Sequence, residues 1–546
     1  MTQGLFDAFY LPPALARDAE TTVQRFGPAH DAIELRLATV TPSTLARWIE
    51  ALCAARAKHL AGRPAAEIHR VLERVAQRFL DPQSPVHRNA TAWLARSGRF
   101  STPMIERALQ DTFRPLAHGG VSRWVESELG SAAVLDRPEP DRTGIPRQAF
   151  GPEWMLQIYA GNVPGLPVWP FYSALAMKSA LLAKTASQEP VLAPLLARTI
   201  AEEDPGLGAC FAVVWWKGGT DELDRAAISR APAVLAFGSE NATANIARES
   251  HPDATLVLHG PKVSVGYISS AALTRSALPS LASRAAYDIA LYDQQGCLSP
   301  HAFYVERGGE IGPAAFASAL GGALEALRDE LPRSEPSAER AATVQLYRAQ
   351  AQFEEAVGSR GTQVLASREG TDWTLVYEDG AGFTPTPAYR IVRIHAVRGV
   401  EEVALALRPV SHAIEAVGIE ARGREKEDLA VAFAAIGVPR IAEVGSLQSP
   451  ALSGTHGGVH RLAPFLKWST VELYSAEPPL IRPTLPAARR PKWTSAGRRP
   501  RKKKRTSVAR KPKKRTSPAR KPKRRPVSGS KSRKRKPATK QRRGRR

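Results

Sequence analysis

The sequence between residues 153 and 260 carries five short apolar runs: WMLQIYA (154–160), SALLAK (179–184), CFAVVWW (210–216), AVLAF (233–237) and TLVLH (255–259). Segments with helical periodicity separate these runs. The alternation predicts a mostly parallel sheet with helices on both faces, whose ligands bind beyond the carboxyl ends of the strands. No GxGxxG follows any of the runs, so the pattern predicts a cofactor domain without naming its cofactor.

The flanking sequence extends this α/β pattern. The first 130 residues are predicted to be mostly helical, with Cys53 as a core thiol, because apolar residues recur there with helical spacing. These are Leu45, Trp48, Ile49, Leu52 and Cys53. The turn-forming segment PEPDRTGIP (138–146) predicts a connection or a protruding hairpin. A second α/β stretch runs from about residue 271 to 440, before the glycine-rich loop SGTHGG (453–458).

The positive charge of the chain is concentrated at one end. The 546 residues include 77 Lys and Arg against 52 Asp and Glu, a formal net charge of +25. Thirty of these basic residues and none of the acids lie in residues 489–546, so the rest of the chain is mildly acidic. Within this tail, KKRTSVARKP (503–512) is followed by KKRTSPARKP (513–522). Unbroken charge with proline and serine predicts a disordered segment.

A tail of this composition is a polycation that neutralises phosphates. We therefore expect it to bind nucleic acid non-specifically, with an affinity that falls steeply as salt rises, and to associate the protein with the nucleoid. Its lone aromatic residue, Trp493, does not support base-specific readout. The alternative is a charge run without a dedicated partner.

Cysteine usage indicates the compartment of the protein. The three cysteines, Cys53, Cys210 and Cys297, exclude a disulfide scaffold and form no Cys/His cluster with zinc-like spacing, so no metal is expected. They indicate a reducing compartment. The first residues lack a basic segment followed by an apolar run, and nowhere do 18 apolar residues follow one another. We therefore expect a cytoplasmic protein without a membrane span.

Cys297 is the candidate nucleophile. It lies in YDQQGCLSPHAFYVE (292–306), on a predicted loop between a helical stretch and a strand. Polar and flexible neighbours predict the semi-polar pocket that a reactive thiolate needs. They are Gln294, Gln295, Gly296, Ser299 and His301. The alternative is a buried structural thiol, because free cysteine is commonly just a small apolar residue.

Four motifs follow one another in a recognisable order: AGNVPG (160–165), LLAKTASQEP (181–190), AFGSEN (236–241) and QQGCLSPH (294–301). With them, the chain from about residue 153 to 472 resembles the LuxC-type long-chain acyl-CoA reductases, a branch of the aldehyde dehydrogenase superfamily. The resemblance implies an aldehyde-dehydrogenase-like α/β fold, with a Rossmann-type cofactor domain, an α/β catalytic domain and the active site between them. It also implies a homo-oligomer, assembled through the region 138–147 and the segment after Leu466.

Pattern and resemblance together predict four parts of the chain. Residues 1–265 form an N-terminal helical region with the cofactor-binding domain, and residues 266–440 form the catalytic domain. A C-terminal return segment follows at residues 441–488. Residues 489–546 are the disordered Lys/Arg-rich tail.

The resemblance also implies the catalytic residues. Cys297 attacks an acyl thioester, while the side-chain amide of Asn162 and the Cys297 backbone N–H hold the oxyanion. A free thiol is mostly protonated at neutral pH, so we expect a helix terminus or a nearby cation to help its ionisation. His456, in SGTHGG, is a candidate for proton transfer, although Gly457 stands where relatives often carry an acid. His301 is a second candidate, and a structural hydrogen bond explains it equally well.

Cofactor residues follow from the same resemblance. Lys184 resembles the superfamily lysine that contacts the adenosine ribose, and Ser187 stands where NAD-preferring relatives usually carry an acid. Because an acid repels a 2′-phosphate, its absence favours NADPH. Four further residues fit the surface that faces the cofactor: Gly218, Phe237, Gly238 and Ser239. Glu378 lies too far from Phe383 to match the ribose-binding glutamate of the superfamily, so we expect a solvated turn acid there.

One departure indicates the direction of the reaction. Hydrolytic aldehyde dehydrogenases carry a glutamate as general base before the second domain, but the matching segment LVLHGPK (256–262) has no carboxylate. Such a site suits acyl exchange with a thiol. The predicted function is therefore NADPH-dependent reduction of a long-chain fatty acyl-CoA to the fatty aldehyde through a Cys297 thioester. An acyl-protein synthetase is implied as a partner, because relatives in luminous bacteria work beside one. The alternatives are an aldehyde-oxidising dehydrogenase and a DNA-binding protein with an inactive enzyme domain.

Overall fold

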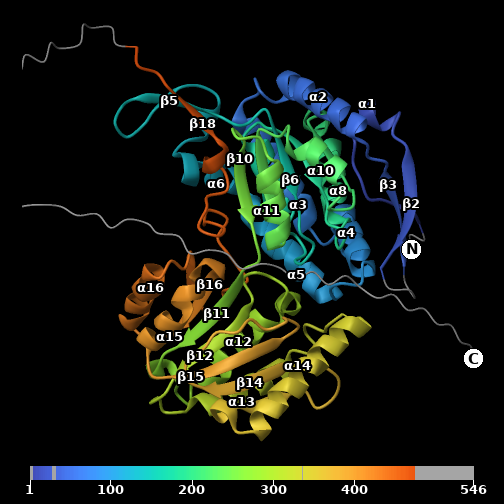
Figure 1. The fold of residues 1–546 in the computed structure, drawn as a ribbon. Helices are drawn as coiled ribbons and strands as arrows, with labels where there is room; N and C mark the ends of the chain where they lie inside the picture. The colour runs from blue at the N-terminus through green and yellow to red at the C-terminus, as the bar shows by residue number, and fades with distance from the viewer. Residues whose placement is uncertain (1–3, 28–31, 335, 474–546) are drawn as a thin grey trace, which may run out of the picture. The chain divides into compact units, whose positions relative to one another are not determined.

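The computed structural model describes residues 4–27, 32–334 and 336–473 of the chain (Figure 1). A five-stranded and a seven-stranded sheet organise two lobes in these residues. The basic tail predicted at residues 489–546 lies outside the described residues, as does the predicted return segment beyond residue 473.

The first lobe contains a parallel sheet in the order β10-β9-β6-β7-β8. The five apolar runs are its strands, as predicted: β6 (Trp154–Ile158), β7 (Ala180–Lys184), β8 (Phe211–Val214), β9 (Ala233–Phe237) and β10 (Thr255–His259). The helices between them are α7 (Val168–Ala176), α8 (Leu192–Glu203), α9 (Pro205–Gly208), α10 (Asp221–Ile228) and α11 (Glu240–Glu249). Strand β6 pairs with both β7 and β9, so the strand order reverses there. The carboxyl ends of β6 and β9 therefore form the switch point at which α/β sheets bind ligands.

Helices dominate the N-terminal region, as predicted. They are α1 (Pro13–Ala16), α2 (Pro42–His59), α3 (Ala65–Leu80), α4 (Pro85–Arg96), α5 (Thr102–Phe113) and α6 (Gly120–Leu129). Leu45, Trp48, Ile49 and Leu52 are buried on one face of α2, whereas Cys53 is only half-buried and does not lie deep in the core.

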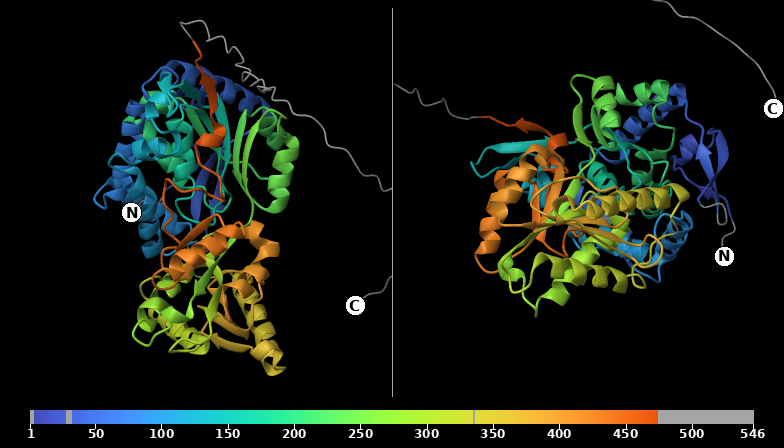
Figure 2. Two further views of the ribbon diagram at one scale, coloured as in Figure 1. Left: turned by 90° about the vertical axis from the view of Figure 1, so that its left-hand side faces the viewer. Right: turned by 60° about the horizontal axis from the view of Figure 1, so that its bottom comes forward.

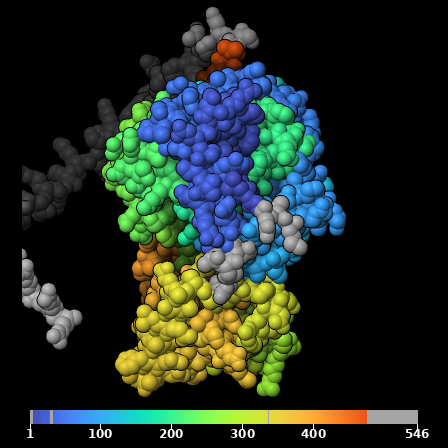
Figure 3. Space-filling view, turned by 90° about the vertical axis from the view of Figure 1, so that its right-hand side faces the viewer, coloured from blue at the N-terminus to red at the C-terminus, as the bar shows by residue number. Residues whose placement is uncertain are grey.

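A small sheet precedes α2, with α1 between its first two strands, and was missed by the helical prediction. It consists of β1 (Phe6–Asp7), β2 (Thr21–Phe26) and β3 (Ile33–Ala38) in the order β1-β3-β2. Strand β3 alternates buried and partly exposed side chains over most of its length, the period-2 pattern of a half-buried strand, while β2 is almost entirely exposed. Figure 3 shows these N-terminal residues (blue) on the outside of the first lobe.

The second lobe contains a seven-stranded sheet in the order β13-β14-β15-β12-β11-β16-β17. Its strands are β11 (Val263–Ile268), β12 (Pro300–Glu306), β13 (Gln363–Ala366), β14 (Thr374–Asp379), β15 (Ile391–Val397), β16 (Ile414–Glu420) and β17 (Arg440–Glu443). All neighbouring pairs are parallel except β13 with β14. The helices of this lobe are α12 (Leu278–Ala290), α13 (Pro313–Ala326), α14 (Ala338–Ala356), α15 (Val400–Leu407) and α16 (Glu425–Ala435).

The change of sheet occurs slightly earlier than the predicted boundary after residue 265. That boundary falls inside β11, which belongs wholly to the second sheet, so the chain crosses between His259 and Val263. At the other end, β17 continues the second sheet to Glu443.

The return segment runs back to the first lobe. Strand β18 (Lys467–Thr470) pairs antiparallel with β5 (Pro146–Phe150), which in turn pairs with β4 (Glu139–Pro140). The hairpin predicted at residues 138–146 is therefore present, and Figure 2 shows β5 (teal) and β18 (orange-red) side by side. The Glu128 carboxylate accepts hydrogen bonds from the backbone N–H groups of Leu462 (2.9 Å) and Ala463 (3.1 Å), which anchors the return segment on α6.

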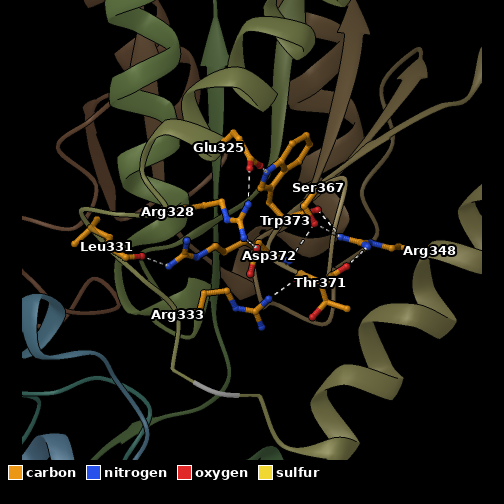
Figure 4. A network of polar contacts seen from close by, with 11 residues as sticks. Glu325, Arg328, Leu331, Arg333, Arg348, Ser367, Thr371, Asp372 and Trp373 are labelled. Atoms are coloured by element: carbon orange, nitrogen blue, oxygen red, sulfur yellow. Dashed lines mark hydrogen bonds and ion pairs between the residues drawn. The ribbon is translucent and has the colours of Figure 1, made fainter.

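An arginine network fastens two helices to one edge of the second sheet (Figure 4). Arg348 of α14 is buried and donates to the Trp373 carbonyl (2.7 Å) and the Ser367 hydroxyl (3.0 Å). The Trp373 indole N–H donates to the Glu325 carboxylate of α13 (2.9 Å). Because each donor reaches an acceptor on another element, the loop before β14 is held firmly on both helices.

Over the part of the chain that the structure describes, no helix combines the length and the apolar character needed to cross a membrane.

Candidate active site

Two cavities meet next to the carboxyl ends of β6 and β9. The larger has a volume of about 910 Å³ and the smaller about 450 Å³. Six residues line both: Leu166, Phe237, His259, Cys297, Glu415 and His456. The predicted nucleophile therefore lies where the two cavities join, at the switch point that the strand order defines.

A left-handed turn carries the chain into the nucleophile. Tyr292, Asp293 and Gln294 have φ angles of 57°, 51° and 60°, although none is glycine. Each such residue costs on the order of 1–3 kcal/mol unless its surroundings hold it. Here Arg390 Nε donates to Asp293 Oδ1 (3.0 Å), and the Ile391 N–H donates to Gln294 Oε1 (2.8 Å). The segment before β15 thus fixes the loop that ends at Cys297.

The Cys297 thiol is not ionised in advance. Its sulfur lies 3.9 Å from Nε2 of His456, and its backbone carbonyl accepts a hydrogen bond from the Ser264 hydroxyl (2.9 Å). Burial, and after it the charge of Glu415, raises the pKa of the thiol to about 12. Arg440 acts in the opposite direction but does not compensate. Arg440 is thus a nearby cation that lowers the thiol pKa, as expected, but burial outweighs it, so a proton acceptor is also needed.

Asn162 lies on the loop after β6. It faces residues 292–297, which end at Cys297 and are called the nucleophile loop. Its side-chain Nδ2 donates to the backbone carbonyl of Gln295 (2.8 Å). Because a side-chain amide has two N–H donors, one of them is not used by this hydrogen bond. Arg99 of the N-terminal region donates to the Gln295 side chain (2.7 Å), so Gln295 is held from the first lobe through both its backbone and its side chain.

His456 is stacked against a second histidine. Its ring centroid lies 4.2 Å from that of His259, with the planes 16° apart, and the His259 ring is stacked on Phe237 at 4.8 Å. Burial lowers the pKa of His259 to about 4 and that of His456 well below its ordinary value. Both imidazoles are therefore neutral at pH 7 and can accept a hydrogen bond, although the low pKa makes each a weak base.

Glu415 is the residue of this site that the sequence analysis missed. It is the second residue of β16, its side chain is buried, and its Oε1 accepts a hydrogen bond from the Gly457 N–H (2.8 Å). The conclusion that no carboxylate is available was correct for the segment 256–262, but the fold supplies one from another strand. The available signal was an acid inside the otherwise apolar run AIEAVGI (413–419).

The larger cavity contains every residue predicted to contact the cofactor: Lys184, Ser187, Gly218, Phe237, Gly238 and Ser239. Lys184 ends β7, and its Nζ lies 5.2 Å from the centroid of the Trp216 ring, where burial lowers its pKa. The Ser187 hydroxyl accepts a hydrogen bond from the Trp215 indole (3.1 Å). Ser239 caps the N-terminus of α11.

These residues fit a dinucleotide. A volume of about 910 Å³ lies in the range of cofactor-sized sites. A Cβ added at Gly238 would lie 3.0 Å from the Cβ of Ala242, so the turn before α11 is already tightly packed, with little space for a larger side chain. The backbone N–H groups at the start of α11 are favourable for a phosphate.

Comparison with known proteins agrees with this geometry. The sequence model of the family described as "Acyl-CoA reductase (LuxC)" matches residues 60–468. The chain belongs to this family.

Relatives of this LuxC-family chain include two proteins named "Long-chain acyl-protein thioester reductase". The one from Photorhabdus luminescens is 26% identical over 366 residues, which cover 66% of this chain and 72% of that protein. The one from Vibrio harveyi is 25% identical over 351 residues, which cover 64% and 70%.

Solved structures show that the LuxC-family chain has the aldehyde dehydrogenase fold. The NAD-dependent benzaldehyde dehydrogenase of Corynebacterium glutamicum matches with a TM-score of 0.60 and 15% identity, over 83% of this chain and 95% of that one. Aldehyde dehydrogenase 21 of Physcomitrella patens matches with a TM-score of 0.63 and 13% identity, over 86% and 98%. The predicted fold class is confirmed.

Two other candidates of the LuxC-family chain lie outside the two cavities. His301, at the start of β12, is buried and its Nδ1 accepts a hydrogen bond from the Thr386 N–H (3.2 Å), which gives it a structural role. Glu378 is buried in β14 and ion-paired with Arg393 at 2.5 Å, so the expectation of a solvated turn acid is wrong. Strand β14 carries Glu378 into the interior, where the paired guanidinium offsets the cost of burying its charge.

Proposed function

We propose that this chain reduces a long-chain fatty acyl thioester to the fatty aldehyde through a thioester on Cys297. The supporting observation is the place of the thiol at the junction of a dinucleotide-sized cavity and a second, mainly apolar one. The second cavity is lined by apolar side chains that suit an acyl chain, among them Val163, Leu166, Trp169, Leu235, Val257, Leu298 and Phe465. A bound nicotinamide cofactor supplies the hydride.

The residues of the chain perform the steps before and after that transfer. Cys297, once its proton is removed, attacks the thioester carbonyl and expels the donor thiol. The free N–H of Asn162 and the Cys297 backbone N–H stabilise the oxyanion, each contribution being worth about 2.7–4 kcal/mol in comparable sites. The neutral ring of His456, 3.9 Å from the sulfur, is placed to accept the proton of the thiol.

NADPH is the cofactor that we propose. Ser187 leaves the ribose end of the larger cavity without an acid at the position where a carboxylate would repel a 2′-phosphate. Lys184, Arg225 and Arg248 line the same cavity and carry positive charge.

We propose acyl-CoA as the acyl donor. The alternative donor is an acylated protein, since the relatives are named for an acyl-protein substrate. In that second case an acyl-protein synthetase is the expected partner.

The antiparallel pair of β18 with β5 is the proposed contact of a homo-oligomer, because Trp468 and Phe150 are exposed on it.

The first experiment follows NADPH consumption on tetradecanoyl-CoA while the aldehyde is trapped. Cys297→Ala is expected to abolish turnover, and Cys53→Ala, which removes a half-buried thiol outside both cavities, is expected to retain it. Oxidation of tetradecanal with NADP, in place of thioester reduction, would establish the aldehyde-oxidising alternative.

We further propose that residues 489–546 bind nucleic acid through their 30 basic side chains. Fully extended, a segment of this length spans roughly 200 Å, so it can bind DNA while the enzyme turns over. Binding of a random DNA duplex is expected to weaken steeply between 50 and 200 mM salt, and to be lost when the chain ends at residue 488. Equal binding by the truncated chain would assign the contact to the enzyme body.

A further inference from the structure

We propose that Glu415 takes up the proton of the Cys297 thiol and returns it to the departing thiolate of the acyl donor, with His456 as the intermediate carrier. This inference rests on the proposed function and adds the residue that holds the proton during acyl transfer. The segment LVLHGPK (256–262) has no carboxylate where hydrolytic relatives carry their base, so the carboxylate of the site has to come from elsewhere.

The position of Glu415 is the first argument. It lines both cavities together with Cys297 and His456, and its residue is 2% exposed. One oxygen, Oε1, is occupied by the Gly457 N–H at 2.8 Å. The other oxygen, Oε2, is buried and has no hydrogen-bond partner within the described residues. A buried carboxylate oxygen without a donor is costly, and a proton removes that cost.

Gly457 provides the second argument. A Cβ at this position would lie 3.7 Å from Glu415 Oε2 and 3.6 Å from His259 Nδ1. The missing side chain thus leaves a space that faces both the free carboxylate oxygen and the stacked imidazoles. Its φ of +58° is one that glycine adopts without strain. The acid that relatives often carry next to this histidine is absent here, and Glu415 brings a carboxylate to the same place from β16.

Charge conservation is the third argument. Moving the thiol proton onto a neutral histidine creates two opposite charges in a buried site, whereas moving it onto Glu415 leaves one negative charge before and after. Burial disfavours charge separation, so the carboxylate is the better final acceptor. His456 Nε2 lies 3.9 Å from the sulfur, and the next residue, Gly457, donates its N–H to Glu415, so the imidazole and the carboxylate adjoin one another in the fold. The charges that act on Glu415 are Lys262, Arg440 and Arg461, its charge in turn acts on Cys297, and His259 and His456 line the same cavities.

The acyl-transfer step balances with these groups alone. Cys297 S–H loses its proton to Glu415, the resulting sulfur anion forms the S–C bond to the acyl carbonyl carbon, and the bond from that carbon to the donor sulfur breaks. The electron pair of the broken bond stays on the donor sulfur, which takes the proton back from Glu415. The products are the Cys297 thioester, a neutral donor thiol and an ionised Glu415, with no oxidant or reductant consumed.

The test compares Glu415→Gln with the full chain of unchanged sequence, because glutamine keeps an oxygen for the Gly457 N–H but cannot hold the proton. Two rates are measured between pH 6 and 9: alkylation of Cys297 by iodoacetamide, and acylation of Cys297 by tetradecanoyl-CoA, followed by mass spectrometry without cofactor. We expect alkylation to become faster at each pH in this range, because removing the negative charge of Glu415 makes the thiol more acidic. We expect acylation to slow by roughly 10² despite the more acidic thiol, the usual effect of losing a general acid–base group.

Glu415→Asp restores a carboxylate and is expected to recover part of the acylation rate. Glu420→Gln makes the same substitution at the far end of β16, outside both cavities, and is expected to change neither rate. Acylation of Glu415→Gln at the unchanged or a higher rate across the pH range would overturn the proposal. If the unmodified chain is not acylated at all, acyl-CoA fails as the donor in the proposed function, while an unchanged alkylation rate in Glu415→Gln would separately refute the coupling of Glu415 to the thiol.

Discussion

Arg390→Met tests whether a buried ion pair holds the nucleophile loop. Arg390 and Asp293 are 1% and 2% exposed. The guanidinium donates to Asp293 Oδ1 through Nε at 3.0 Å and to the Leu331 carbonyl at 2.8 Å. Methionine fills much of the volume but leaves the Asp293 carboxylate without its main partner.

The expected loss of folding stability depends on the charged groups that remain around Asp293. Breaking a buried ion pair by removing one partner typically costs about 3–5 kcal/mol. Arg333 Nε is still 3.9 Å from Asp293 Oδ1 and offsets part of the charge, so we expect the lower end, about 3 kcal/mol. We also expect a loss of turnover on the order of 10², because the left-handed turn from Tyr292 to Gln294 is released and the sulfur moves.

Urea unfolding followed by tryptophan fluorescence measures the loss of stability. The rate of Cys297 acylation measures the loss of activity. Arg328→Met is the matched control, because Arg328 belongs to the network in Figure 4 but its side chain is 42% exposed and pairs with Glu325 and Asp372 at the surface. Its expected cost is below about 1 kcal/mol. Equal stability losses in the two variants would refute the reasoning, as would an Arg390→Met chain that acylates Cys297 at the normal rate.

Three further predictions concern the cavities and the pH dependence of stability. Ser187→Asp is expected to shift the ratio of kcat/KM for NADPH over NADH at least tenfold toward NADH. The reason is that a carboxylate beside a 2′-phosphate costs more than about 1.4 kcal/mol of binding free energy. An unchanged ratio would place the 2′-phosphate elsewhere. Val459 is an exposed residue of the smaller cavity. Val459→Trp is expected to reduce turnover of tetradecanoyl-CoA more than turnover of hexanoyl-CoA. Equal losses with the two substrates would show that the acyl chain binds elsewhere. Burial lowers the pKa of His301 to about 4 in the folded chain. The unfolded chain, with a histidine pKa near ~6.5, binds the proton first, so stability falls by about 2 kcal/mol from pH 7 to pH 5 through this residue. Urea unfolding of His301→Asn at the two pH values is expected to lack this part of the loss.

The layout of the fold could be predicted because it depends on local patterns. Each of the five apolar runs between residues 153 and 260 is long enough for one strand and is separated from the next by helical periodicity, so the parallel sheet follows from hydrophobic burial alone. The exposed strand β2 could not be recognised in this way, because its side chains face solvent and its partner β3 lies across the turn. The exact change of sheet near Val263 was also uncertain, because β10 and β11 are separated by only three residues.

The candidate site was predictable only where a motif surrounds a residue. Cys297, Asn162 and the cofactor residues each lie in a loop next to a strand or, like Lys184 and Phe237, at the end of a strand, and all of them line the larger cavity. The state of the thiol was not predictable, because its pKa depends on burial and on Glu415, which is 118 positions away in the chain.

What the sequence by itself determined is the five strands of the first parallel sheet, the helical character of most of the N-terminal region and the family resemblance, since these depend on residue types at short spacing. Only the tertiary structure decided which groups share the site. Hydrogen bonds join Gly457 to Glu415 and Arg390 to the nucleophile loop, ring stacking joins His456 to His259, and none of these pairs shares a local pattern. These long-range pairs depend on how the two sheets pack. Packing also sets the proton affinity of a buried group, because that affinity depends on the charges brought within a few ångströms of it.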